Sequence, residues 1–277
     1  TSQITSYTHA LLEPYRVRNA VVMAAGLSSR GAPISYEKPK GLLRVRGERL
    51  IERQIRQLHE VGIRDITIAV GYLKEKFEYL IDKYDVELLY NPEYSGKNTL
   101  ATIYRARRVL KGRNMYVLSS DNWMRENMYH AYECGAWYSA AFQKGETKEW
   151  CLSFNKKGRI TDVKVGGRDQ WVMYGPTYFS REFTSRFMPV LEAYYKTPGT
   201  EQFYWEQVYV DMLTGEAKRR LEQEDQEILK QAVRESALPA GHWNEIEMDA
   251  NRQPEDQVYE FENLEELRLF DPRYQNH

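Results

Sequence analysis

The feature that most constrains the fold of this chain is the alternation of short apolar runs with amphipathic segments through its first half. The predicted strands are 19–24, 66–70, 86–90 and 115–118, and the predicted helices are 48–61, 73–84 and 99–110. Strands separated by helices of this length require right-handed crossovers, and therefore a parallel sheet. The pattern predicts a Rossmann-like α/β fold, a mostly parallel sheet with helices on both faces. Ligands of such a sheet bind beyond the carboxyl ends of its strands.

Beyond residue 135 the pattern changes to strand-like segments joined by short turns. The predicted strands are 136–142, 150–154, 160–165, 171–174 and 245–248, with a hairpin turn at 155–158 and helices at 180–195, 203–213, 215–235 and from Asn263 onward. We expect 136–277 to be an appended α+β portion that covers the sheet edge within one domain, 18–277. We expect 1–17 to be an extension, the remnant of a preceding module.

Charge and hydropathy exclude several classes of protein. The formal net charge is −1, so no overall charge favours binding to nucleic acid or to a membrane surface. No apolar run approaches the roughly 20 residues that cross a bilayer, and no signal-peptide pattern opens the sequence. We therefore expect a cytoplasmic protein without nucleic-acid or membrane partners, and keep open that it is one piece of a longer multidomain chain.

The segment directly after the first predicted strand, 23–30, is rich in small residues. Gly26 and its neighbours let the backbone approach a phosphate or a base closely, and consecutive amide groups can form an anion-binding concavity. Arg30 can clamp a phosphate in a bidentate manner, and Pro39 stiffens the approach of Lys40. These residues suit a triphosphate, although the spacing matches neither the P-loop nor the dinucleotide-binding pattern. The alternative is an ordinary loop with surface charges.

Acidic residues at two places are candidate metal ligands. Asp121 follows the strand predicted at 115–118, and Mg²⁺ prefers one or two carboxylates together with phosphate oxygens and water. Glu260 and Glu262 lie on the same face if the segment around them is a strand, so one of them could complete the site. The alternatives are that Asp121 caps a helix and that the two glutamates face solvent.

Two clusters combine aromatic and acidic residues. Trp150 follows Glu149, and Tyr204, Trp205 and Glu206 are consecutive. Aromatic rings beside carboxylates can enclose a quaternary ammonium group. The alternative is that these rings are core aromatics whose polar tips are hydrogen-bonded.

Taken in order, these features resemble the sugar-phosphate nucleotidyltransferase superfamily, and within it they are most similar to bacterial choline-phosphate cytidylyltransferases. The resemblance runs from about residue 18 to 270. The segments that carry it are 24–26 through 39–40, 70–75, Asn98 before a helix, 120–123, 149–150, 204–206 and 259–262.

The resemblance implies an enzyme that transfers CMP from CTP to phosphocholine, giving CDP-choline and pyrophosphate, with Mg²⁺ as cofactor. It implies that Arg30 binds the leaving phosphates and that Lys40 contacts the α-phosphate or the acceptor phosphate. The implied nucleotide-binding residues are Ala24, Ala25, Gly26, Ser28, Ser29, Arg30, Gly71, Tyr72 and Asn98. The implied catalytic residues are Arg30, Lys40 and Asp121, the acceptor-binding residues Trp150, Tyr204 and Glu206, and the metal ligands Asp121 and Glu262, with Glu260 in reserve.

Two alternatives to this function stay open. A nucleotidyltransferase of the same fold could act on phosphoethanolamine, an aminophosphonate or a sugar 1-phosphate; the aromatic and acidic clusters favour a cationic acceptor over a sugar. A regulatory module could bind the nucleotide without turnover, but the presence of Arg30, Lys40 and Asp121 favours an enzyme.

Overall fold

A seven-stranded sheet forms the centre of the protein in a computed structural model, which describes residues 2–27, 37–224 and 245–274 together with residues 227, 231 and 234. The strand order is β10-β8-β9-β6-β1-β4-β5. The strands are β1 (Asn19–Ala24), β4 (Asp65–Val70), β5 (Glu87–Tyr90), β6 (Met115–Ser119), β8 (Trp137–Phe154), β9 (Ile160–Phe179) and β10 (Asp249–Arg252). Because β6, β1, β4 and β5 are mutually parallel, the predicted Rossmann-like sheet is confirmed.

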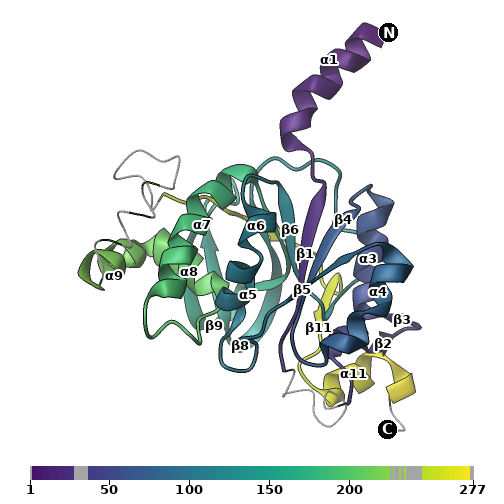
Figure 1. The fold of residues 1–277 in the computed structure, drawn as a ribbon. Coiled ribbons are helices and arrows are strands. Elements are labelled where there is room, and N and C mark those ends of the chain that lie inside the picture. The colour runs from purple at the N-terminus through teal and green to yellow at the C-terminus, as the bar shows by residue number, and fades with distance from the viewer. Residues whose placement is uncertain are drawn as a thin grey trace.

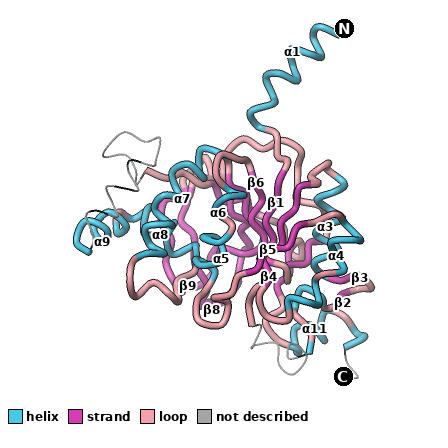
Figure 2. The backbone as a smooth tube through the Cα atoms, in the orientation of Figure 1, coloured by secondary structure: helices cyan, strands magenta, loops and turns pink. Residues whose placement is uncertain are grey.

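Helices cover both faces of this sheet, as Figures 1 and 2 show. On one face lie α3 (Leu50–Glu60), the 3₁₀ turn η4 (Lys74–Phe77) and α4 (Tyr79–Tyr84); on the other lie α5 (Thr99–Arg105), α6 (Arg107–Leu110), α7 (Arg181–Lys196), α8 (Trp205–Thr214) and α9 (Glu216–Glu224). Strand β1 carries apolar side chains on both faces of the sheet, so helices must cover both faces. Val22 packs into the core under α3, whereas Val21 packs into the core under α5, since successive side chains of a strand point to opposite faces.

Two predicted helices of the first half differ in detail. The segment 73–84 is divided into η4 and α4, preceded by Leu73 in the left-handed region with φ of 51°. The segment 99–110 is divided into α5 and α6 at Ala106. Helix α3 begins two residues later than predicted, because Glu48–Arg49 (β3) pairs with Arg44–Val45 (β2).

The second half is corrected in three places. The segments predicted as four short strands are two long strands, β8 and β9, whose register shifts interrupt the regular alternation that marks a continuous strand. The strand predicted at 245–248 is wrong, because β10 begins only at Asp249. Within the helix predicted at 215–235, the structure contains α9, which ends at Glu224. Most of the predicted helix beyond Glu224 lies outside the described residues. The hairpin turn is confirmed: the Gly158 amide donates to the Asn155 carbonyl at 2.9 Å.

A separate two-stranded sheet lies beside the larger one, at the carboxyl end of β6. Strand β11 (Val258–Glu260) pairs antiparallel with β7 (Asn122–Met124), which directly follows β6. The chain continues into α11 (Leu264–Phe270), where the Asn263 side chain accepts a hydrogen bond from the Glu266 amide at 3.0 Å, which confirms the helix predicted from Asn263 onward. The described residues also include the short 3₁₀ segments η1 (Glu13–Tyr15), η3 (Lys40–Leu42) and η5 (Pro272–Tyr274).

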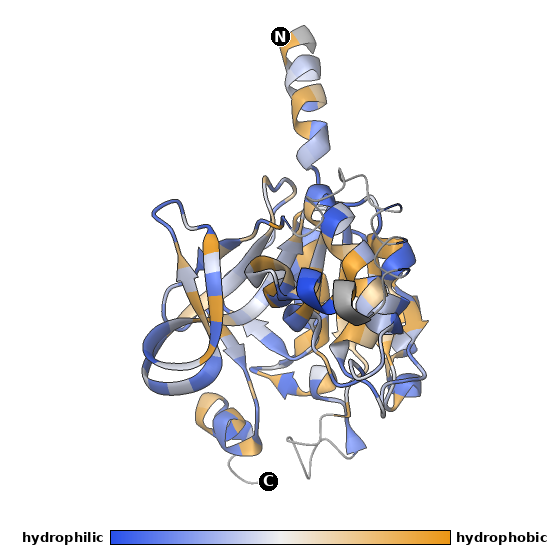
Figure 3. Ribbon diagram, turned by 90° about the vertical axis from the view of Figure 1, so that its left-hand side faces the viewer, coloured by the Kyte–Doolittle hydropathy of each residue, from blue (hydrophilic) through white to orange (hydrophobic). Residues whose placement is uncertain are grey.

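Helix α1 (Ser2–Leu12) projects away from the rest of the molecule (Figure 1). Hydrophobic and hydrophilic residues are mixed around it (Figure 3), and its apolar residues Ile4, Tyr7 and Leu11 are exposed. Across the described part of the chain, no helix has the length and apolar character needed to span a bilayer.

Candidate active site

A cleft of about 520 Å³ lies at the carboxyl ends of β1 and β6. Strand β1 is the switch point of the sheet, since β4 lies on one side of it and β6 on the other, and such a point leaves a crevice at the strand ends. The walls come from the segments 23–27, 39–41, 94–99 and 119–121, and from Thr102, Tyr138, Gly175, Gln202, Tyr204, Glu206 and Glu260. Both halves of the chain therefore contribute to it.

The wall predicted to hold the nucleotide is partly described. Ala24, Ala25, Gly26 and Asn98 line the cleft, whereas Ser28, Ser29 and Arg30 lie outside the described residues. Asn98 also begins α5, where its side chain accepts from the Thr99 amide at 2.8 Å.

Gly71 and Tyr72 support this wall from behind and are not among the residues that line the cleft. A Cβ atom on Gly71 would lie 2.7 Å from the Ala25 carbonyl oxygen and 2.6 Å from Cβ of Tyr94. The Tyr72 amide donates to the same carbonyl at 3.3 Å. Only glycine permits this close contact of two loops, so the position serves to hold Ala25.

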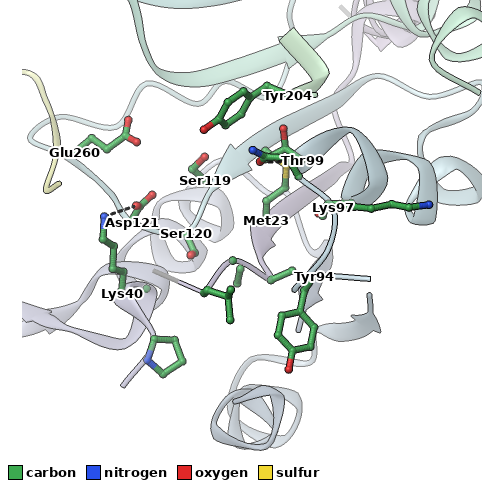
Figure 4. Close-up of a pocket in the computed structure, with 18 of the residues that line it drawn as sticks. Met23, Lys40, Tyr94, Lys97, Thr99, Ser119, Ser120, Asp121, Tyr204 and Glu260 are labelled. Atoms are coloured by element: carbon green, nitrogen blue, oxygen red, sulfur yellow. Dashed lines mark hydrogen bonds and ion pairs between the residues drawn. The ribbon is translucent and has the colours of Figure 1, made fainter. Parts of the chain in front are cut away.

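Lys40, Asp121 and Glu260 meet at one end of the cleft (Figure 4). Nζ of Lys40 lies 3.8 Å from Oδ2 of Asp121. Burial and the negative charge of Asp121 raise the pKa of the Glu260 carboxyl to about 8, although the charge of Lys40 opposes the shift. Two acidic groups are thus held together beside one lysine.

A buried glutamine holds the loop that carries Asp121. Gln54, on α3, is 1% exposed, and its Nε2 donates to the carbonyl oxygens of Ser119 at 2.7 Å and Asn122 at 3.2 Å. Its Oε1 accepts from the Tyr129 hydroxyl at 3.2 Å. Sequence analysis missed this residue; a polar side chain on the apolar face of a predicted helix was the available signal.

The second acidic residue of the site is the reserve candidate Glu260, and Glu262 does not line the cleft. Strand β11 places Glu260 opposite Asn122, the neighbour of Asp121, and Nδ2 of Asn122 lies 3.4 Å from Oε2 of Glu260. The strand ends at Glu260, so the alternation assumed in the prediction does not reach Glu262. The backbone amide of Glu262 donates instead to Oε2 of Glu266 at 2.9 Å, just before α11.

Asp121 and Glu260 fit a Mg²⁺ ion that takes its remaining ligands from a substrate and from water. No group of three or more potential protein ligands occurs within 2–27, 37–224 and 245–274 or at the three further described positions. Two carboxylates are the number that Mg²⁺ takes when phosphate oxygens and water supply the rest. Oδ1 of Asn122 is buried beside them and accepts no hydrogen bond from any described residue.

The two predicted aromatic clusters come together at the cleft. Tyr204 lines the cleft, and its ring meets that of Trp150 edge to face, with centroids 6.4 Å apart. Trp150, on β8, is half-buried and is not among the residues that line the cleft. Trp205, between Tyr204 and Glu206, is 1% exposed and belongs to the core. For this residue the alternative prediction, a core aromatic, is confirmed.

Glu206 is a further acidic residue that lines the cleft. The Tyr138 hydroxyl donates to its Oε1 at 3.0 Å, and its Oε2 is buried without a hydrogen-bond partner in the described structure. Burial raises the pKa of this carboxyl to about 7, while the bond from Tyr138 opposes the shift. Tyr138 was not predicted as a site residue. A tyrosine within a predicted strand carries no signal that separates it from a core residue.

Comparison with known proteins gives both sequence and structural relatives. Residues 20–151 match the model of the MobA-like NTP transferase domain. The chain is 31% identical over 192 residues to a choline-phosphate cytidylyltransferase of Streptococcus pneumoniae, covering 69% of this chain and 83% of that protein. It is 35% identical over 192 residues to a 2-aminoethylphosphonate cytidylyltransferase of Lancefieldella rimae, covering 69% and 78%.

The solved structure of the CTP:phosphocholine cytidylyltransferase from Streptococcus pneumoniae superposes with a TM-score of 0.78 at 25% identity, covering 93% of this chain and 99% of that chain. A glucose-1-phosphate thymidylyltransferase structure from Bacillus anthracis, described as putative, has a TM-score of 0.61 at 13% identity, a likeness of fold alone. These findings confirm the resemblance that the sequence motifs indicated.

Proposed function

The chain belongs to the family of MobA-like NTP transferase domains, and from that membership we propose that it is a cytidylyltransferase transferring CMP from CTP to phosphocholine, with release of pyrophosphate. The observation that carries the proposal is the arrangement of the cleft. Lys40, Asp121 and Glu260 line it, and so do Tyr204 and Glu206. A phosphate-handling centre and a group of residues suited to a cation thus share one cleft.

The proposed reaction is an in-line displacement at the α-phosphorus of CTP. The acceptor phosphate is already ionised at neutral pH, so it attacks without a general base, and pyrophosphate leaves. Lys40 contacts the α-phosphate or the incoming phosphate, while the backbone around Ala25 and Gly26 holds the base and ribose. Mg²⁺, held by Asp121 and Glu260, supplies charge neutralisation when bound. Catalysis then rests on positioning and on neutralising negative charge.

For the acceptor we propose that Tyr204 faces the ammonium group, that Trp150 packs edge to face against the Tyr204 ring and holds it there, and that Glu206 balances the positive charge. A trimethylammonium group has no N–H to donate, so ring faces and carboxylate fields are what recognise it. A 2-aminoethylphosphonate is the main rival, because a relative of 35% identity carries that name and a primary ammonium group could donate to Oε2 of Glu206. A sugar 1-phosphate fits less well, since a sugar needs many polar side chains around its hydroxyls.

Pyrophosphate release across a matrix of substrates tests this proposal. CTP, UTP, GTP, ATP and dTTP would each be combined with phosphocholine, phosphoethanolamine, 2-aminoethylphosphonate and glucose 1-phosphate. We expect the highest kcat/KM for CTP with phosphocholine. A higher value for 2-aminoethylphosphonate would replace the acceptor and keep the reaction, whereas binding of CTP without turnover of any acceptor would favour the regulatory module.

A further inference from the structure

Tyr174 holds the backbone of Glu260 from a different strand. The Tyr174 hydroxyl accepts a hydrogen bond from the Glu260 amide at 2.6 Å and donates one to the Glu260 carbonyl oxygen at 3.3 Å. A tyrosine hydroxyl can donate one hydrogen bond and accept another at the same time. One side chain therefore satisfies both backbone groups of Glu260.

An irregularity in the main sheet brings Tyr174 to this place. Tyr138 of β8 pairs with Thr177 of β9, and Ala140 pairs with Met173, so one residue between the pairs on β8 faces three on β9. The additional residues belong to a β-bulge, 174–176, which bends the strand and redirects its side chains. Bulges of this kind are found beside active sites.

The same bulge seats β11 through a second contact. Gly175 has φ of +100°, and a Cβ atom there would lie 2.8 Å from Cγ1 of Val258, the first residue of β11. The strand that carries Glu260 therefore packs closely against Gly175 at its beginning and is hydrogen-bonded to the Tyr174 hydroxyl at its end. The one strand that pairs with β11 in the described structure is β7.

We propose that Tyr174 is a positioning residue for Glu260, fixing the backbone from which this carboxylate reaches toward Asp121 and the metal. The proposal rests on the proposed function, because it takes Asp121 and Glu260 as metal ligands. Tyr174 is not among the residues that line the cleft, so it acts through Glu260 and not on the substrate. Residues that orient metal ligands typically contribute about 10- to 100-fold to metal affinity or activity.

Binding of Mn²⁺ to the full chain with CTP and no acceptor, followed by electron paramagnetic resonance, tests this role without turnover. We expect Tyr174→Phe to weaken Mn²⁺ binding about 10-fold. Tyr194→Phe is the matched control: it removes a hydroxyl that donates to Asp211 at 2.8 Å, away from the cleft, and should leave Mn²⁺ affinity within about twofold. Thermal unfolding of each variant separates loss of fold from loss of position.

A double-mutant cycle with Glu260→Gln makes the assignment specific. If Tyr174 acts through the Glu260 carboxylate, Tyr174→Phe should add little to the loss already caused by Glu260→Gln. Wild-type Mn²⁺ affinity in Tyr174→Phe, or losses that multiply in the double variant, would overturn the positioning role and leave the proposed function intact. Failure of the wild-type protein to bind Mn²⁺ with CTP would overturn both.

Discussion

Nζ of Lys40 lies 3.8 Å from Oδ2 of Asp121, although one residue follows the loop after β1 and the other follows β6. The two strands are parallel neighbours, so the segments after them emerge at the same edge of the sheet. Their side chains are only 15% and 20% exposed, which shields the pair from solvent.

Asp121→Asn should lower kcat by about 10² or more, because it removes one of the two carboxylates proposed to hold the metal. Activity of the wild-type protein should also require added Mg²⁺ after treatment with EDTA. Steady-state pyrophosphate release measures both effects. Asp82→Asn, an exposed aspartate on α4, is the control and should behave as wild type. Full turnover in metal-free reagents would contradict the metal site.

Glu260→Gln and Glu262→Gln should differ sharply. Glu260 lines the cleft opposite Asn122, whereas Glu262 lies beyond the end of β11. We expect Glu260→Gln to lower kcat about 10²-fold and to raise the Mg²⁺ concentration needed for half-maximal rate. Glu262→Gln should stay within about twofold of wild type. The reverse order of effects would restore Glu262 as the second ligand.

Lys40→Ala should lower kcat more than it raises the KM for CTP. A positive charge aimed at the reacting phosphates stabilises charge that develops in the transition state, and such a contribution is commonly about 10² in rate. Lys38→Ala removes a charge from the same segment at a position outside the cleft lining and should have little effect. Equal losses in the two variants would mean that only the general charge of the segment matters.

Trp150→Ala should raise the KM for phosphocholine by up to about thirtyfold, because Trp150 holds the Tyr204 ring, and a desolvated cation–π contact of that ring is worth ~2 kcal/mol. The KM for CTP should change little. The KM for phosphoethanolamine should rise less, because a primary ammonium group can still donate to carboxylates. Trp171→Ala is the control, since it truncates an aromatic ring on β9 that packs against Phe142. An unchanged KM for phosphocholine would return Trp150 to a purely structural role.

The KM for phosphocholine should fall as the pH rises through about 7. Burial raises the pKa of Glu206 to about 7, so below that pH its carboxyl is mostly neutral and cannot balance an ammonium group. Above that pH the carboxylate is charged and should bind the cation more strongly. Ionisation of the acceptor phosphate near pH 6 affects wild type and Glu206→Gln alike. Only the wild type should therefore show the additional change near 7.

The sequence by itself determined the nucleotide half of the protein. Apolar runs ending at Ala24 and Leu118 marked two central strands, and the residues that follow them lie at the cleft, as Ala25, Gly26 and Asp121 show. This succeeded because strand and helix periods are local properties of the chain, and a parallel sheet gathers its strand ends at one edge. The tyrosine and glutamate expected at the acceptor end also line the cleft.

Tertiary structure alone decided how distant segments face one another. The register of β11 on β7 brought Glu260 beside Asp121 and left Glu262 outside, and a bulge in β9 placed Tyr174 under Glu260. Gly71 proved to support Ala25 from behind. No local period encodes such pairings, because they depend on which strands meet and on the residue at which each strand ends. A shift of one residue in β11 would have exchanged the faces of its side chains, and only the folded chain fixes that shift.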